Sequence, residues 1–153
     1  MICNGERSRM EAGFTIDISD TNDDYLDADI HVWNARFSGR THTYVGNTAL
    51  TQLAEIIDGF PASVPDERQY EFGTRDRKYA GGYCGLRFYT VDSVGHAALD
   101  VDIVDDPGWY AANHIVKLTI PVVAADIDRF IKALYALEVR RHGSITLGET
   151  GDS

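Results

Sequence analysis

Two segments of this chain repeat one order of hydrophobic patterns, and this repeat limits the fold more than any other feature of the sequence. In each segment, three stretches that alternate apolar and polar residues precede one stretch with apolar residues at helical spacing. ADIHVW at 28–33 matches LDVDIV at 99–104 in this pattern. The matching helical positions are Leu50, Leu53 and Ile57 in the first segment and Ile127, Phe130 and Leu134 in the second. Alternation indicates half-buried strands and helical spacing indicates an amphipathic helix, so the sequence predicts two similar βββα units.

Each predicted unit has one apolar sheet face and one apolar helix stripe, and neither closes a core by itself. We therefore expect the units to pack together as one α+β domain, with antiparallel sheets and two helices on them. At 153 residues the chain is long enough to bury such a core. The expected parts are a frayed lead over 1–12, a domain over 13–147 with units at 13–60 and 83–142 and a connector at 61–82, and a frayed tail over 148–153.

Three local expectations refine this outline. A hairpin that turns at Asn34-Ala35 places Asp29 opposite Arg40, which suggests an ion pair across two strands. Pro121 is expected to end the last strand of the second unit, because proline has no backbone N–H for the ladder. Short strands are expected near 69–73, inside the connector, and at 144–147, at a sheet edge.

The chain is acidic, since 24 Asp and Glu residues against 14 Lys and Arg residues give a formal net charge of −10. This charge disfavours nucleic acid as a partner, because its phosphates would be repelled, and it suits a basic protein, whose opposite field speeds encounter. An acidic surface also keeps a protein soluble without any partner, so net charge alone leaves both explanations open.

The sequence shows no membrane or disulfide signature. No apolar run approaches the roughly 20 residues of a membrane-spanning helix, and the N-terminal residues lack the apolar core of a signal peptide. The two cysteines, Cys3 and Cys84, are too few for a disulfide framework. We therefore expect free thiols in a reducing cytoplasm and no membrane partner.

The segment DTNDDYLDAD at 20–29 raises a choice between a cation site and an acidic turn. Counted from Asp20, it supplies the first three oxygen ligands of an EF-hand-type calcium loop. Tyr25 stands where that loop needs glycine, however, and His31 stands where it needs glutamate. Asn and Asp favour turns, so we expect a polar turn between two strands that presents an acidic tip.

Carboxylates recur on the outward side of equivalent strands in the two units, with aromatic residues near them. They are explained either as a solvated sheet face with protected edges or as an electrostatic contact surface for a partner. Exposed Trp and Tyr beside carboxylates favour the contact surface, although loops and helices also cover such side chains. On that hypothesis, Asp100→Asn slows association and leaves stability nearly unchanged. The candidate partner-binding residues are Asp24, Asp27, Asp29, Trp33, Asp100, Asp102, Asp105, Asp106, Trp109 and Tyr110.

No residue pattern in the chain marks catalytic chemistry. There is no Gly-x-Ser-x-Gly nucleophile elbow and no His-Glu-x-x-His zinc motif. The glycine-rich stretch at 81–85 enters a strand, whereas a phosphate cradle opens a helix. We expect no enzyme activity, no catalytic residue, no metal and no cofactor.

The C-terminal segments GLRFYTVDSVGHAALDVDIVDD and HIVKLTIPVVAADIDRFIKALYAL combine hydrophobic strands with a helix of pattern Val-x-x-x-Ile-x-x-Phe-x-x-x-Leu-x-x-Leu. This outline, over residues 83–147 with a fainter repeat at 28–60, resembles small bacterial immunity-type proteins of the WapI-like group and related uncharacterised domains from polymorphic toxin loci. The resemblance rests on core patterning and transfers no functional residue. It implies a non-catalytic cytoplasmic protein that binds and neutralises a cognate toxin, and the acidic charge suits a basic toxin.

The sequence therefore predicts a non-catalytic protein-binding domain, with an immunity protein against a basic toxin as its most specific form. One alternative is a structural or regulatory domain that forms a homodimer through an exposed strand edge. A small enzyme without a recognisable motif is a further alternative.

Overall fold

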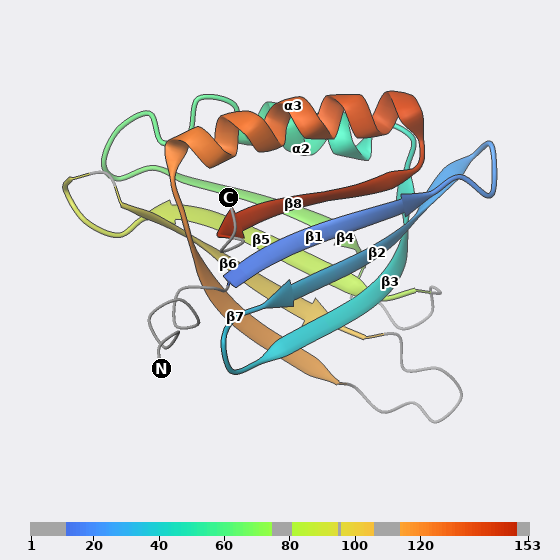
Figure 1. The fold of residues 1–153 in the computed structure, drawn as a ribbon, viewed down its shortest axis with the longest axis horizontal. Helices are drawn as coiled ribbons and strands as arrows, with labels where there is room; N and C mark the ends of the chain where they lie inside the picture. The colour runs from blue at the N-terminus through green and yellow to red at the C-terminus, as the bar shows by residue number, and fades with distance from the viewer. Residues whose placement is uncertain (1–11, 75–80, 95, 106–113, 150–153) are drawn as a thin grey trace, which may run out of the picture.

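The computed structural model describes residues 12–74, 81–94, 96–105 and 114–149 (Figure 1). In chain order its elements are β1 (Ala12–Ser19), β2 (Tyr25–Trp33), β3 (Ser38–Gly46), α2 (Ala49–Ile57), β4 (Glu67–Gly73), β5 (Tyr83–Thr90), β6 (Ala97–Val104), β7 (Ile115–Val122), α3 (Ala124–Arg140) and β8 (Gly143–Glu149). The predicted α+β class is confirmed, and the order strand, strand, strand, helix occurs twice, as β1-β2-β3-α2 and β5-β6-β7-α3.

The strands form two antiparallel four-stranded sheets. The first sheet has the order β3-β2-β1-β8, and the second sheet has the order β4-β5-β6-β7. After each helix, the chain adds one strand to the sheet of the other unit. β4 follows α2 and pairs with β5 of the second unit, whereas β8 follows α3 and pairs with β1 of the first unit. Each three-stranded unit thus gains a fourth strand from outside itself.

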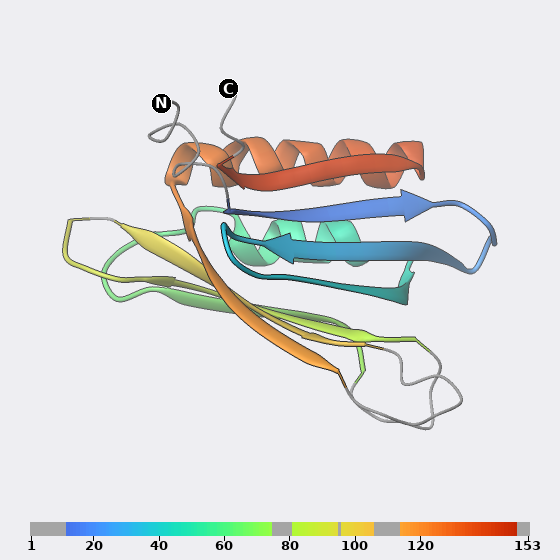
Figure 2. The same ribbon diagram turned by 60° about the horizontal axis from the view of Figure 1, so that its bottom comes forward.

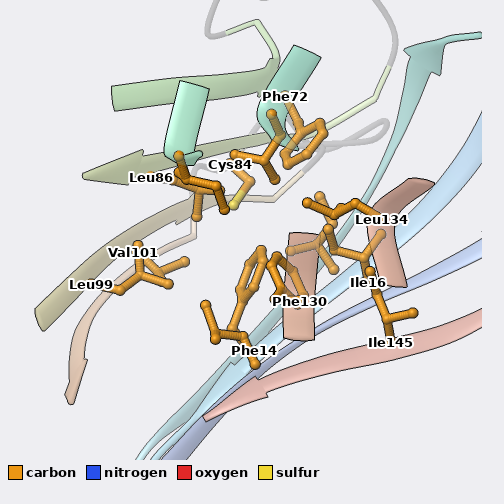
Figure 3. Packing of buried hydrophobic residues seen from close by; sticks show 14 of the residues in the cluster. Phe14, Ile16, Phe72, Cys84, Leu86, Leu99, Val101, Phe130, Leu134 and Ile145 are labelled. Atoms are coloured by element: carbon orange, nitrogen blue, oxygen red, sulfur yellow. The ribbon is translucent and has the colours of Figure 1, made fainter. Parts of the chain in front are cut away.

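One hydrophobic core lies between the two sheets and the two helices. Figures 1 and 2 show the helices side by side along one edge of the sheets, and strands of the two sheets that cross at an angle. In Figure 3, Phe14 of β1 and Leu99 of β6 point toward the ring of Phe130 of α3. Phe14 and Phe130 make an edge-to-face contact with 6.3 Å between ring centroids. The core therefore joins both sequence units, as the incomplete burial of each unit requires.

The two sheets approach most closely where β3 crosses the second sheet and β7 crosses the first. A Cβ atom on Gly39 would lie 2.7 Å from Cβ of Val116, and one on Gly82 would lie 1.8 Å from Oγ1 of Thr41. Both distances are too short for any side chain, so glycine is required at these crossings. The buried Thr41 hydroxyl donates a hydrogen bond to the carbonyl oxygen of Val104 at 3.3 Å, which links the sheets.

The register of the β2–β3 hairpin differs from the prediction by two residues. Arg40 lies opposite His31, and Asp29 lies opposite His42, so the predicted pair of Asp29 with Arg40 is wrong. The cause is the turn, in which the Asn34 side chain accepts hydrogen bonds from the backbone N–H groups of residues 36 and 37. This bonding makes a four-residue connection between the strands, whereas two residues were expected.

The sheet edges also differ from expectation. Pro121 does not end a strand but lies within β7, an edge strand, where a missing N–H removes no hydrogen bond from the sheet interior. The strands predicted near 69–73 and 144–147 occur as β4 and β8, which are both longer than predicted. The frayed ends were expected at 1–12 and 148–153, but Ala12 begins β1 and Glu149 ends β8.

Candidate functional site

The outward side chains of the two sheets form two surfaces on opposite sides of the core, because both inner faces pack into that core. The first-sheet face comprises Thr15, Asp17, Asp27, Asp29, His31, Trp33, Arg40, His42, Tyr44, Ser144 and Thr146. The second-sheet face comprises Glu67, Gln69, Glu71, Tyr83, Gly85, Arg87, Tyr89, Asp100, Asp102, Lys117 and Thr119. The predicted partner-binding residues are thus divided: Asp27, Asp29 and Trp33 lie on one face and Asp100 and Asp102 on the other.

On the second-sheet face, Asp100 of β6 is held by three donors from the two neighbouring strands, β5 and β7. Its carboxylate accepts hydrogen bonds from Arg87 Nη1 at 3.1 Å, from the Tyr89 hydroxyl at 2.8 Å and from Thr119 Oγ1 at 2.7 Å. This carboxylate therefore ties β5 to β6 and β6 to β7. Because three side chains bond this carboxylate, we now expect Asp100 to contribute to stability, whereas the sequence led us to expect that Asp100→Asn leaves stability nearly unchanged.

Arg87 occupies the centre of the same network. Its Nε donates to Glu67 at 2.9 Å, and its guanidinium carbon lies 4.2 Å from the centroid of the Tyr89 ring. The hydrogen bond from Arg87 lowers the pKa of Glu67, and the same bond raises the pKa of Arg87. Burial, followed by the hydrogen bond to Asp100, raises the pKa of Tyr89. The charged side chains of this face thus form their hydrogen bonds and ion pairs largely with one another.

A groove of about 350 Å³ crosses the second-sheet face, and Gln69, Glu71, Tyr83, Arg87, Asp102 and Lys117 are among its lining residues. The Tyr83 hydroxyl donates to Glu71 at 2.9 Å, and a Cβ atom on Gly85 would lie 2.6 Å from that hydroxyl. Lys117 lies 3.8 Å from Asp102. The groove is therefore polar, and a tyrosine side chain covers its only glycine.

The first-sheet face places carboxylates next to each other. Asp17 of β1 lies directly opposite Asp29 of β2, and Asp29 lies opposite His42 of β3. Asp17 and Asp29 are exposed, and neither takes part in a salt bridge within the described part of the chain. One carboxylate oxygen of Asp27 is buried and has no hydrogen-bond partner among the residues that the structure describes, although the other accepts from Thr21 at 2.8 Å. Within the described residues, the carboxylates of Asp17 and Asp29 on this face are therefore not neutralised by an ion pair.

Aromatic rings flank these carboxylates along β2 and β3. The rings of His31 and Trp33 lie 4.8 Å apart, those of His42 and Tyr44 lie 5.1 Å apart, and Tyr25 contacts Tyr44 at 5.2 Å between centroids. Burial, and secondarily the charge of Arg40, lowers the pKa of His31. Partly exposed rings beside unpaired carboxylates give this face the composition of a protein-interaction surface.

Residues 20–24 of the acidic segment form the turn between β1 and β2, and this turn is fixed to the end of α3. Arg141 follows α3 with a left-handed backbone (φ 65°) and donates to the Asp20 carboxylate at 3.0 Å and to the Asn22 carbonyl at 3.0 Å. It also donates to the Asn47 side chain at 2.9 Å, and Asn47 in turn donates to the Asp23 carbonyl. The hydrogen bond from Arg141 lowers the pKa of Asp20. The guanidinium of Arg141 therefore offsets part of the negative charge of this acidic turn.

Two further charged side chains satisfy helix ends and were not found from the sequence. Arg68 donates to the carbonyls of Ile56 and Asp58, which are free at the end of α2. Glu138 of α3 accepts from both the backbone N–H and the hydroxyl of Thr51, in the first turn of α2. Their partners are 10 to 87 residues away, so no local sequence signal identifies them.

Of the remaining predicted residues, Asp24 and Asp105 lie apart from both faces. Asp24 is exposed in the β1–β2 turn, where its backbone N–H bonds the Asn22 side chain. Asp105 follows β6, and Thr41 Oγ1 lies 3.5 Å from its carboxylate. Asp106, Trp109 and Tyr110 lie outside the described residues, as does Cys3. Cys84 is buried in β5, and burial raises the pKa of its thiol, so this cysteine is a core residue.

Within the described ranges, no group of three or more His, Cys, Asp or Glu side chains is arranged to hold a metal ion. Neither described helix combines the length and the apolar character of a transmembrane span.

No protein-family model and no curated protein matches the chain. Among solved structures, the plant transcriptional regulator PBF-2 is similar, with 8% sequence identity and a TM-score of 0.48 over 86% of this chain and 78% of that chain. A similarity at this level carries no argument about function.

Proposed function

We propose that this protein is a non-catalytic binding protein that docks a basic partner protein on its first-sheet face. One observation carries the proposal: Asp17 and Asp29 are exposed, lie directly opposite each other and form no ion pair within the described residues, whereas Asp100 on the opposite face is satisfied within the protein. Unpaired carboxylates attract a positively charged partner and speed its approach. The neighbouring Trp33 and Tyr44 supply the aromatic contact area that strong protein interfaces use.

The partner class that we propose is a basic toxin, with this chain as its immunity protein in the cytoplasm. The resemblance of residues 83–147 to immunity-type proteins and the net charge of −10 support this form of the proposal. An immunity protein of this kind acts by occupying the toxin surface and needs no cofactor. The proposal excludes nucleic acid as the partner, because the same charge repels phosphates.

The groove on the second-sheet face supports a binding role less well. Its charged side chains already bond one another, as Arg87 does with Glu67 and Asp100. A catalytic site needs polar groups that converge on a space where substrate binds, and these groups converge on each other instead. We therefore place the function on the first-sheet face.

Affinity capture from lysate of the source cells, at low and then high salt, tests this proposal with two matched variants. Thr146→Lys adds a positive charge to the first-sheet face, and Gln69→Lys adds the same charge to the second-sheet face; both residues are exposed. We expect one basic protein that elutes with salt, that is retained by Gln69→Lys and that is lost from Thr146→Lys. Retention by both variants, or loss from both, overturns the assignment to the first-sheet face. Light scattering of the purified protein separates this proposal from a homodimer.

A further inference from the structure

We infer that Arg141 is a positioning residue, which fixes the acidic turn at 20–24 and, through that turn, orients the Asp27 carboxylate on the first-sheet face. This inference rests on the proposed function, because it concerns the face on which we place partner binding. Three observations lead to it: the backbone conformation of Arg141, the segments that its side chain joins, and the hydrogen bond from the turn to Asp27.

Arg141 has a backbone conformation that disfavours arginine. It follows α3 with φ 65°, and its N–H donates to the Leu137 carbonyl at 2.8 Å, which ends the helix. The other described residues with positive φ are all glycines. Glycine is the usual residue at this position after a helix, because a Cβ atom makes the left-handed region unfavourable. The main chain alone thus favours glycine here, and the reason for arginine lies in its side chain.

The guanidinium of Arg141 joins three segments that are far apart in the sequence. Its Nε and Nη2 atoms each lie 3.0 Å from an oxygen of the Asp20 carboxylate, and Nη2 also donates to the Asn22 carbonyl at 3.0 Å. Its Nη1 donates to the Asn47 side chain, between β3 and α2, and Asn47 donates to the Asp23 carbonyl at 2.9 Å. A planar fork can make these contacts at the same time, whereas the compact ammonium of lysine cannot.

The turn that Arg141 holds is itself bonded to a side chain of the first-sheet face. Thr21 Oγ1 donates to Oδ2 of Asp27 at 2.8 Å, and Oδ1 of Asp27 has no hydrogen-bond partner among the described residues. Asp27 lies opposite Ser19 of β1 and opposite Tyr44 of β3. Within the described part of the chain, Thr21 therefore orients this carboxylate, and the position of Thr21 depends on the turn that Arg141 fixes.

A competing explanation for arginine at this position is the helix dipole, which favours any cation near the end of a helix. Arg140, the last residue of α3, already supplies an exposed cation there, and its Nε donates to the His142 carbonyl at 2.9 Å. The two explanations require different properties of Arg141. The dipole needs only a positive charge, whereas the positioning role needs the guanidinium fork. Arg141→Lys keeps the charge and removes the fork, so it separates them.

NMR relaxation of the backbone amides of residues 21–24 tests the inference in the protein itself. In the wild type and in the control Arg140→Ala, we expect order parameters near the value of rigid backbone, about 0.85. In Arg141→Lys and Arg141→Gly they should fall below about 0.6, although glycine suits the backbone of residue 141. Wild-type order in Arg141→Lys assigns the arginine to the helix dipole and overturns the inference, as does wild-type order in Arg141→Gly.

The carboxyl-carbon resonance of Asp27 tests the second step of the inference. It should shift in Arg141→Gly, whereas the resonance of Asp29, two residues further along β2, should not. Asp20→Ala removes the partner carboxylate and leaves the end of α3 unchanged, so it keeps the test valid if Arg141→Gly disturbs the helix. It should loosen the turn and shift the Asp27 resonance in the same way. An unshifted Asp27 resonance in both variants overturns the inference.

Affinity capture distinguishes failure of the inference from failure of the proposed function. Arg141→Gly and Arg140→Ala each remove one positive charge, so general electrostatic attraction to a basic protein changes equally in both. We expect the captured basic protein to elute from Arg141→Gly at a lower salt concentration than from the wild type and from Arg140→Ala. If the turn is released but elution is unchanged, the positioning role is wrong and the proposed function stands. If the folded wild type captures no basic protein, the proposed function fails, whatever the NMR measurements show for the turn.

Discussion

The two outward faces of this protein are each built from four antiparallel strands of 7 to 9 residues, yet their carboxylates have opposite surroundings. On the second sheet, Asp100 faces Arg87 and is bonded by three side chains. On the first sheet, Asp29 faces Asp17 and His42, and no ion pair within the described residues neutralises it. The outward position of an Asp residue in a strand therefore does not by itself determine its role. The residue opposite it on the neighbouring strand determines whether the carboxylate stabilises the sheet or remains available to a partner.

The largest expected effect concerns the core that supports both faces. Leu134→Ala removes a fully buried side chain of α3 and should lower the free energy of unfolding by roughly 2–5 kcal/mol. Urea unfolding measures this loss. Val139→Ala, on the exposed side of the same helix, should change stability by less than about 0.5 kcal/mol. A loss of less than about 1 kcal/mol for Leu134→Ala would show that α3 does not hold the two sheets together.

Removing the structural carboxylate should have the next largest effect. Asp100→Ala leaves Tyr89 and Thr119 without their acceptor and should lower the free energy of unfolding by roughly 1–2 kcal/mol. Asp29→Ala is the matched control, and it should cause no such loss. Binding of the basic partner should be preserved in Asp100→Ala. If both variants lose the same stability, the contrast between the faces disappears.

Removing one of the two opposed carboxylate charges should have a smaller effect on the free energy of unfolding, and this effect should be a gain in stability. Asp29→Asn abolishes the like-charge contact with Asp17 and should raise the free energy of unfolding by roughly 0.2–1 kcal/mol at low salt. Urea unfolding at low and at high NaCl concentration measures it. The gain should shrink at about 1 M salt, since screening already weakens the repulsion in the wild type. A destabilised Asp29→Asn would mean that this carboxylate has a structural partner.

The smallest expected effect is a pH dependence on the first-sheet face. The pKa of His31 is lowered in the folded state, chiefly by burial, from its ordinary value of 6.5. The unfolded chain therefore binds this proton more readily, and the stability that neutral His31 contributes is present above pH 6.5 and is lost as pH falls through the lower folded pKa. His31→Gln should reduce the difference between urea midpoints at pH 7.5 and pH 5. An unchanged difference would assign the pH dependence to other groups.

The repeat and the core could be predicted from the sequence, because strand alternation and helix spacing directly encode which side chains are buried. The helical positions named from the sequence are all buried: Leu50, Leu53, Ile57, Ile127, Phe130 and Leu134. β4 was harder to predict, since its inward positions in ERQYEFG are Arg68, Tyr70 and Phe72, of which only Phe72 is fully buried. Its strand conformation comes from pairing with β5, which is a tertiary effect.

The candidate site could be predicted only in part. The outward position of Asp29 and Trp33 follows from alternation, but Asp17 was not recognised as a candidate, although FTIDIS places it outward. Its importance depends on the register with β2, which no local pattern specifies. The turn at 34–37 shifted the neighbouring register by two residues and so removed the expected partner of Asp29. The partner of Asp20 lies 121 residues away and could not be inferred.

Because β8 pairs with β1, the two sheets are completed at different times during synthesis. The four strands of the second sheet are consecutive along the chain, so they can pair as soon as β7 has left the ribosome. The first sheet has only three strands at that point, and the edge of β1 stays unpaired until α3 and then β8 have been synthesised. The sheet that bears the opposed carboxylates is therefore completed after the second sheet, and the edge of β1 is open until translation has passed Glu149.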